Sequence, residues 1–304
     1  MTRTKIRHRN KLLFPVFLLF ALLLIICVPT FVEAPSTPPS DPSPEPDDSV
    51  TQQIPDPPKL GWVEENGLHY YYAAEDVMST GWVEIDSKPY YFLPDGSMAT
   101  GKVEIDGRNR FFAHDGSELL LANPWNFIPE DHVPETVCFN GWQYVSVECH
   151  DALMTMLDGC RQAGLTPYVA SAYRTHGDQR YLYNNKIQRL INEGYSVEDA
   201  NRLAGTVVAV PGTSEHELGL ALDLVDYNYR NLDEAQENTP VQQWFMAHCW
   251  EYGFILRYPN DKSDITGIIY EPWHYRYVGR TVAEEIHKSG LCLEEYLQSL
   301  TRES

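Results

Sequence analysis

The stretch Pro211-Gly-Thr-Ser-Glu-His-Glu-Leu-Gly-Leu-Ala-Leu-Asp223 decides how the larger part of the chain is interpreted. In its second half, leucines alternate with two small residues and then Asp223, which predicts a strand with one apolar face. The small residues leave room beside Asp223 for a metal ion and a substrate. His216 shares the parity of the leucines, so a turn near Glu217 must bring it round to Asp223.

A second stretch, Tyr270-Glu-Pro-Trp-His274, supplies a further imidazole and a further carboxylate. Two histidines and one aspartate are enough to hold a catalytic zinc ion with one coordination position left open. His216, Asp223 and His274 are therefore the candidate metal ligands, and Glu271 is left to act as the base on water. A fourth protein ligand would close the site and make it structural, so Glu271 is assigned to proton transfer.

A third group of candidate site residues lies upstream of these two stretches. Residues 166–172 are expected to form a strand, and Arg174 follows its end. The guanidinium is permanently charged and suits an oxygen that gains negative charge in a transition state. Gln179 and Tyr181 lie on the helix expected over 178–191, where they are candidates to face the substrate.

Charge and composition exclude some classes of function. The 304 residues carry a formal net charge of −20, which argues against a sequence-independent hold on nucleic acid. Hydrophobic residues make up 43% and aromatic residues 12% of the chain, enough for a packed core. None of the six cysteines forms a Cys-x-x-Cys metal signature. One disulfide outside the cytoplasm and buried free thiols both remain open for them.

The N-terminus is expected to anchor the chain in a membrane. A basic tail over residues 1–11 precedes an apolar run over 12–32, long enough for a bilayer core, which needs roughly 20 residues. The basic flank should stay in the cytoplasm and place the C-terminus outside. A cleaved signal peptide is disfavoured by Pro35, and a lipid-modified Cys27 by the bulky residue before it.

Residues 33–59 form a linker rich in Pro, Ser and Asp. Such a segment cannot bury a core and tends towards polyproline II, so it is expected to be an extended spacer. It would lift the following domains from the membrane surface.

An internal repeat with a period of 20 residues occupies residues 60–120. Gly61-Trp-Val-Glu64 recurs at 81–84 and, with Lys102 in place of Trp, at 101–104. Each copy continues into a cluster of aromatic residues. Each unit is therefore expected to be a β-hairpin, and because a lone hairpin is marginal in water, the units should stack into a small solenoid.

These repeats resemble the choline-binding, or cell-wall-binding, repeats of Gram-positive surface proteins. In that family, aromatic residues of neighbouring repeats form cages that hold a quaternary ammonium by cation–π attraction. The resemblance implies a ligand such as choline on a cell-wall polymer, with Trp62, Tyr71, Trp82 and Tyr91 as its candidate contacts. In the alternative interpretation, the aromatic residues form only the core of the solenoid.

The larger domain is expected over residues 127–304. Strands and helices alternate there without regular βαβ units, so the predicted class is α+β. The expected helices cover 146–164, 178–191, 196–203, 240–252, 281–289 and 293–300, and the expected strands cover 166–172, 218–224, 254–258, 268–270 and 274–278.

Three blocks of this domain resemble the D-Ala-D-Ala metallopeptidases of the VanY type, and they occur in that family's order. The central block is Ser214-x-His216-x-x-Gly219-x-Ala221-x-Asp223, preceded by Ser171-Ala-Tyr-Arg174 and followed by Glu271-Pro-Trp-His-Tyr-Arg-Tyr-Val-Gly279. The resemblance implies the α+β fold of the hedgehog and D-Ala-D-Ala peptidase class.

Carried over to this sequence, the resemblance implies a role for each motif residue. His216, Asp223 and His274 correspond to the zinc ligands, and Glu271 to the base that deprotonates water and then protonates the leaving amine. Arg174 corresponds to the arginine that steadies the scissile carbonyl. Ser214 and Trp273 would line the substrate site.

The predicted function is that of a zinc D-alanyl-D-alanine carboxypeptidase that removes the terminal D-Ala from peptidoglycan stem peptides. It would be held at a Gram-positive cell membrane by one helix, with its C-terminal domains facing the wall. An L,D-carboxypeptidase acting on tetrapeptide stems is the alternative within enzymes. A non-catalytic cell-wall-binding protein is the alternative from another class, but it predicts a broken ligand set, and the set is complete.

Overall fold

The computed structural model describes residues 57–129 and 132–301. The predicted basic tail, the apolar run over 12–32 and nearly all of the spacer lie outside the described residues. Among the residues that are described, no helix combines the length and apolar character that a membrane crossing requires.

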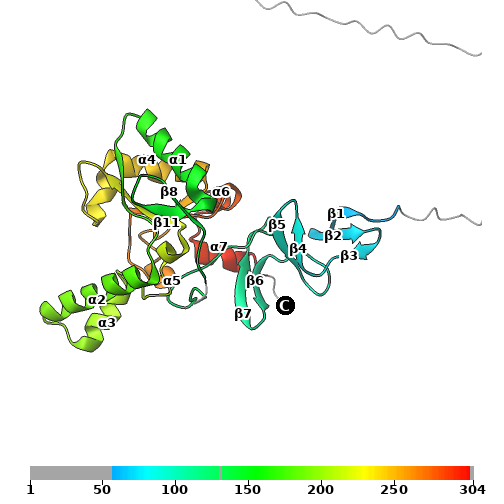
Figure 1. The fold of residues 1–304 in the computed structure, drawn as a ribbon, viewed down its shortest axis with the longest axis horizontal. Helices are drawn as coiled ribbons and strands as arrows, with labels where there is room; N and C mark the ends of the chain where they lie inside the picture. Colours follow the sequence, from blue (N-terminus) through cyan, green and yellow to red (C-terminus); the bar gives the residue numbers. More distant parts are fainter. Residues whose placement is uncertain (1–56, 130–131, 302–304) are drawn as a thin grey trace, which may run out of the picture. The chain divides into compact units, whose positions relative to one another are not determined.

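The repeat region consists of three consecutive antiparallel hairpins, as the 20-residue period predicts (Figure 1). The turns of the first and third hairpins each have two residues with positive φ, as a two-residue hairpin turn requires. In the first turn, φ is 54° at Asn66 and 74° at Gly67. In the third turn, φ is 52° at Asp106 and 73° at Gly107. The strands are β1 (Gly61–Glu65), β2 (Leu68–Ala74), β3 (Val77–Met78), β4 (Gly81–Ile85), β5 (Lys88–Phe92), β6 (Gly101–Ile105) and β7 (Arg108–Phe112).

Each hairpin buries its apolar side against the next one. Phe92 and Phe112 are fully buried, and they pack in two separate clusters. The first cluster includes Tyr71 of the preceding hairpin, and the second includes Tyr91. The expected stacking of the hairpins is therefore confirmed, and its physical cause is that one hairpin has too little core of its own.

The larger domain is an α+β fold built around a four-stranded antiparallel sheet in the order β10-β11-β13-β12. Its strands are β8 (Thr136–Cys138), β9 (Tyr144–Ser146), β10 (Pro167–Ser171), β11 (Ala221–Asp226), β12 (Phe254–Leu256) and β13 (His274–Tyr277). Its helices are α1 (Val147–Gln162), α2 (His176–Asn192), α3 (Val197–Gly205), α4 (Pro240–His248), α5 (Ser263–Thr266), α6 (Arg280–Ser289) and α7 (Leu293–Ser299), with 3-10 turns at Glu215–Leu218, Glu234–Asn238 and Cys249–Tyr252.

Local sequence explains where the helices begin. Ser146 caps α1, and its side chain accepts from the backbone N–H of Glu148. Thr175 caps α2 in a capping box with Asp178, so this helix begins at His176, two residues before the predicted start. Thr239 caps α4.

Two predicted strands differ from the structure. The strand expected over 218–224 begins only at Ala221, because Glu215–Leu218 forms a 3-10 turn that ends on Gly219 with φ 70°. Residues 268–270 are not a strand at all. The backbone N–H of Ile269 donates a hydrogen bond to the carbonyl of Thr206 instead of to a neighbouring strand of the sheet.

The leucines of β11 face the main core. Leu222 and Leu224 are fully buried there with Leu153 of α1, Phe245 of α4 and Tyr275 of β13. Removal of this apolar surface from water stabilises the sheet. Because side chains alternate along a strand, the other face of β11 is free to present a polar group. The described cysteines are all free thiols, so no disulfide forms among them.

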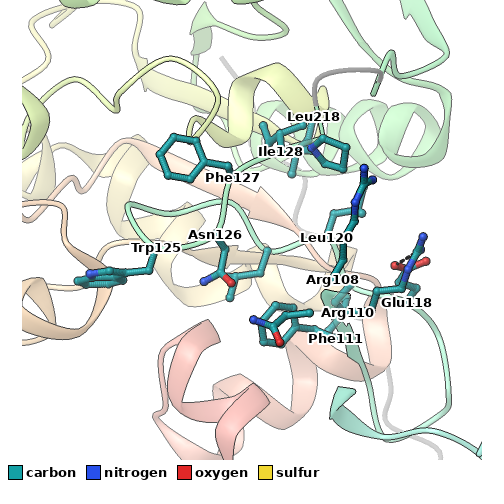
Figure 2. A pocket seen from close by; sticks show the side chains of 14 residues that line it. Arg108, Arg110, Phe111, Glu118, Leu120, Trp125, Asn126, Phe127, Ile128 and Leu218 are labelled. Atoms are coloured by element: carbon teal, nitrogen blue, oxygen red, sulfur yellow. Dashed lines mark hydrogen bonds and ion pairs between the residues drawn. The ribbon is translucent and has the colours of Figure 1, made fainter. Parts of the chain in front are cut away.

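The third hairpin packs directly on the larger domain. Ala113 and Leu119 share a buried cluster with Val282, Tyr296 and Leu297 of the C-terminal helices. A cavity of about 420 Å³ lies between β7 and the segment that follows the repeats, bordered by aromatic and aliphatic side chains such as Phe111, Trp125 and Phe127 (Figure 2). The segment then joins the larger domain, where the N–H of Ile128 donates to the carbonyl of Gly212.

Candidate metal centre

His216 lies on the 3-10 turn before β11. A turn is expected there because His216 would otherwise point to the same side of the strand as the leucines, away from Asp223. Its Nδ1 is 2.8 Å from the carbonyl oxygen of Ala172, which can only accept, so Nδ1 carries the proton. The other ring nitrogen, Nε2, is therefore a free lone-pair donor. It is buried, has no hydrogen-bond partner among the described residues, and lies 3.4 Å from Oδ1 of Asp223.

Asp223 and His274 lie opposite each other on the adjacent strands β11 and β13, where they are directly paired. Oδ1 of Asp223 has no hydrogen-bond partner and lies 3.3 Å from Nδ1 of His274. One ligand atom from each of His216, Asp223 and His274 falls within 4.8 Å of the others. This buried set of imidazole and carboxylate donors with unpartnered atoms fits a zinc ion.

The protonation of this cluster follows from burial and charge. Burial alone would lower the pKa of His274, but the nearby carboxylates of Asp223 and Glu215 outweigh it and raise that pKa to about 9. Burial lowers the pKa of His216 to about 4, with the Arg174 charge acting in the same direction. His216 is therefore neutral at pH 7 and ready to act as a ligand.

Glu271 lines the same cleft as the three candidate ligands, and its Oε2 lies 3.6 Å from Nδ1 of His274. The N–H of His274 donates to its carbonyl at 3.1 Å, which closes the bend that Pro272 predicts. Its side chain is buried, and this burial raises its pKa to about 8, despite the opposing charges of His274 and Arg174. A carboxyl group with a pKa near neutrality can both accept and release a proton at pH 7.

Arg174 follows β10 and is tied to the metal centre through its backbone. Its N–H donates to the carbonyl of His216 at 3.1 Å. Its guanidinium Nε is buried without a hydrogen-bond partner, and burial lowers the pKa of the group, against the raising effect of Asp223 and Glu271. The guanidinium therefore faces the same cleft as the carboxylates.

The cleft over this centre has a volume of about 930 Å³. Three of the predicted substrate contacts line it: Ser214, Trp273 and Gln179. The Nε2 of Gln179 donates to the carbonyl of Ala209 at 2.6 Å, and its Oε1 is buried without a partner. This amide oxygen is available to a ligand.

The predicted placement of Tyr181 in the substrate site is wrong. Its side chain is 67% exposed and does not line the cleft. Two residues after Gln179 on a helix, it points about 200° away around the axis. The cleft side of α2 carries Leu182, Lys186 and Arg189 instead.

Glu215, directly before His216 in the chain, is a buried residue that the sequence motifs do not assign to the site. It is fully buried between Arg257 and Arg276. Burial alone would raise its pKa, but the two guanidinium groups hold it well below the ordinary value. The arginines stand 42 and 61 residues further along the chain, so nothing in the local sequence signals this contact.

The aromatic residues of the repeats form two clusters that differ in one wall. Trp62 lies 5.3 Å from Tyr71 and 5.1 Å from Tyr90 between ring centroids. Trp82 lies 5.2 Å from Tyr91 between ring centroids. The residue equivalent to Tyr90 in the next repeat, 20 residues later, is Arg110.

That arginine is a cation already in contact with the second cluster. The Cζ of Arg110 is 5.2 Å from the centroid of Trp82, and Nη1 pairs with Glu118 at 2.8 Å (Figure 2). Both tryptophans remain 43% exposed, so a ligand can reach them.

Comparison with known proteins identifies both regions. Residues 143–280 match the family described as VanY, D-alanyl-D-alanine carboxypeptidase, and residues 79–125 match the choline-binding repeat. The chain is 40% identical over 182 residues to a D-alanyl-D-alanine carboxypeptidase of Enterococcus faecalis. This alignment covers 60% of this chain and 66% of that protein. It is 36% identical over 187 residues to the putative carboxypeptidase YodJ of Bacillus subtilis, covering 60% and 65%. The match thus spans just under two thirds of the length of these relatives.

Solved structures agree with this assignment. VanYB in complex with D-alanine-D-alanine is 39% identical with a TM-score of 0.55, covering 59% of this chain and 96% of that one. A mutant of the D,D-pentapeptidase VanY in complex with Zn(II) is 40% identical with a TM-score of 0.54, covering 58% and 97%. Through its larger domain, this chain belongs to the VanY family of D-alanyl-D-alanine carboxypeptidases.

Proposed function

We propose that this protein is a zinc-dependent carboxypeptidase that removes the C-terminal D-Ala from peptidoglycan stem peptides. The observation that carries the proposal is the convergence of His216 Nε2 and Asp223 Oδ1, both buried and unpartnered, with His274 in one cleft. The relatives of known structure include one bound to D-alanine-D-alanine and one bound to Zn(II), which supports the same substrate and metal here.

The residues of the cleft divide the work of hydrolysis between them. Zinc held by His216, Asp223 and His274 would supply a Lewis acid that brings the pKa of water to about 7. Glu271 takes the proton from the attacking water as the new C–O bond forms. It returns that proton to the amine nitrogen as the C–N bond breaks, a double role that its raised pKa suits.

The Arg174 guanidinium stabilises the charge that develops on the carbonyl oxygen of the scissile peptide. It is buried in the cleft and keeps Nε without a partner. A preorganised charge in a water-poor site acts more strongly than the same charge in water. Ser214, Trp273 and Gln179 would hold the peptide in place from the cleft walls.

We also propose where the protein works. The apolar run over 12–32 would anchor it in a Gram-positive membrane, and the spacer over 33–59 would lift it towards the wall. The repeats over 60–120 would then contact a choline-bearing or other wall polymer, and the catalytic domain over 127–304 would lie outside the cell. The match to the choline-binding repeat supports the wall contact.

A second candidate activity is the removal of D-Ala from tetrapeptide stems. It is favoured by the likeness to the LdcB LD-carboxypeptidase, which is 31% identical with a TM-score of 0.54 over 66% of this chain and 95% of that one. The metal centre would serve both reactions, because only the residue before the cleaved bond differs.

One experiment tests the activity and separates the two substrates. The purified protein is incubated with a defined stem pentapeptide and a tetrapeptide, with and without a chelator, and the products are identified by mass spectrometry. D-Ala release from the pentapeptide that stops on chelation is expected. Release from the tetrapeptide alone would establish the second candidate, and release that ignores the chelator would end the zinc mechanism.

A further inference from the structure

The carboxylate of Glu215 is buried next to a candidate metal ligand and is only half satisfied. Its side chain is 0% exposed. Oε1 accepts from Nε of Arg257 at 2.8 Å and from Nη1 of Arg276 at 2.9 Å. Oε2 accepts no hydrogen bond from any residue that the structure describes.

The free oxygen of Glu215 faces a free nitrogen of His274. Oε2 lies 3.7 Å from Nε2 of His274, which also has no hydrogen-bond partner. On the other side of the same ring, Nδ1 lies 3.3 Å from Oδ1 of Asp223. The imidazole is thus held between a positioning carboxylate on one side and the metal site on the other.

We propose that Glu215 is a positioning residue that accepts the Nε2–H of His274 and so presents the Nδ1 lone pair to the metal. This inference rests on the proposed zinc site. A histidine ligand has two possible tautomers, and the partner of its other nitrogen selects one of them. Loss of such a partner typically weakens metal binding about 10- to 100-fold.

The two arginines keep this carboxylate charged and fixed. Arg257 also makes two bonds to Glu294 at 2.6 and 2.8 Å, and Nη2 of Arg276 donates to the carbonyl of Leu120 at 2.8 Å. An unpaired buried carboxylate would be strongly destabilising. The carboxylate is therefore anchored through Arg257 to α7 and through Arg276 to the end of the repeat region.

The test separates positioning from a merely structural ion pair. Glu215→Asp keeps the charge that the arginines need but draws the oxygen away from His274. The matched control is Glu217→Asp, which flanks His216 on the other side and contacts His176 and the N–H of Gly212 rather than a ligand ring. Zinc affinity is measured by chelator competition, and the melting temperature of the metal-free protein is recorded for each.

The zinc affinity of Glu215→Asp is expected to fall about 10- to 100-fold, and that of Glu217→Asp to stay within about twofold of the starting protein. A folded Glu215→Asp variant with unchanged affinity would overturn the role. If that variant does not fold, ¹⁵N NMR of the zinc-loaded unmodified protein decides instead. A proton on Nε2 of His274 supports the proposal, and a proton on Nδ1 overturns it. An unmodified protein that bound no zinc would refute the proposed function itself.

A second inference concerns the wall of the cleft that α2 provides. Gln179, Leu182, Lys186 and Arg189 all line the cleft, at spacings that place them on one face of the helix. The helix starts just after Arg174, whose backbone is bonded to His216, so its N-terminal end is at the metal centre. Lys186 is about 10 Å further along the axis than Gln179, and Arg189 about 15 Å.

These two cations face the cleft without a carboxylate partner among the described residues. They stand out in a chain with a net charge of −20. An extended peptide spans about 3.3 to 3.6 Å per residue, so the rise of about 10 Å from Gln179 to Lys186 matches about three residues of a peptide that lies along α2. We infer that Lys186, with Arg189 beyond it, forms a subsite for a free carboxylate about three residues before the cleaved bond.

This inference also rests on the proposed function, and matched substrates test it. Two stem pentapeptides are compared, one with a γ-linked D-glutamate whose α-carboxylate is free and one in which that group is an amide. Lys186→Gln should lower kcat/KM about three- to tenfold for the acid, through KM, and leave the amide unchanged. Arg180→Gln is the control, since it removes one charge from α2 away from the cleft lining. Equal effects of Lys186→Gln on both peptides would overturn the subsite, whereas no cleavage of either by the unmodified protein would refute the activity.

Discussion

Oε2 of Glu271 lies 3.6 Å from Nδ1 of His274, three residues later in the chain. The two side chains reach the same point because the bend at Pro272 closes with a hydrogen bond between their backbones. A proton acceptor is thereby held beside a candidate ligand but outside the set of three whose ligand atoms converge. This relationship fits the proposed role of Glu271 in proton transfer.

Glu271→Gln should therefore separate metal binding from catalysis. The amide keeps the shape of the side chain but cannot accept the proton, so turnover is expected to fall at least about 10²-fold. Zinc content should stay at the level of the unmodified protein. The measurement is stem-peptide hydrolysis alongside metal analysis of the same sample. Activity that survives this change would show that another group is the base.

Zinc binding at pH 7 should release about one proton from His274. Its pKa without metal is raised to about 9, so the ring is protonated at pH 7 and must become neutral to act as a ligand. His216, with a pKa lowered to about 4, is already neutral and releases nothing. Because protons compete with zinc below about pH 9, affinity should rise with pH up to that point. Titration calorimetry in two buffers of different ionisation enthalpy measures the release, and identical heats in both would contradict it.

Gly219→Ala should destabilise the domain by about 1 to 3 kcal/mol. Gly219 has φ 70°, and an added Cβ would lie 2.9 Å from the backbone nitrogen of Ser146. That nitrogen donates to the carbonyl of Gly219, so the two backbones cannot separate without losing the bond. Gly177→Ala is the control, since its nearest contact is an ordinary 3.6 Å to the side chain of Thr175. Thermal unfolding of the two variants compares them, and equal melting temperatures would count against this account of the turn.

The two tryptophans of the repeats should contribute unequally to wall binding. Arg110 already places a cation at Trp82, whereas Trp62 faces Tyr71 and Tyr90 and no described residue places a cation over its ring. Trp62→Ala is expected to weaken retention on choline-bearing cell walls more than Trp82→Ala does. Neither change should affect hydrolysis of a soluble peptide. A larger loss from Trp82→Ala would mean that the guanidinium does not block its cluster.

The sequence predicts the chemistry of the site better than its surroundings. The three motifs that resemble the VanY family, taken as a set, predict that His216, Asp223 and His274 meet, and they do. Their mutual distance depends on the pairing of β11 with β13, a long-range register that the sequence does not encode locally.

The errors have physical causes as well. Tyr181 was placed in the cleft because helix spacing alone does not say which face of α2 is turned inward. The burial of Glu215 cannot be predicted from its neighbours in the sequence, because its two arginines lie far along the chain and only the fold brings them to it. Buried ion pairs of this kind escape any argument from local pattern.

Metal analysis of the purified, fully active protein tests the central claim most directly. With sample activity confirmed on a stem pentapeptide, about one zinc ion per chain is expected, and its removal by a chelator should abolish activity until zinc is restored. A fully active preparation that contains no transition metal would contradict the whole account.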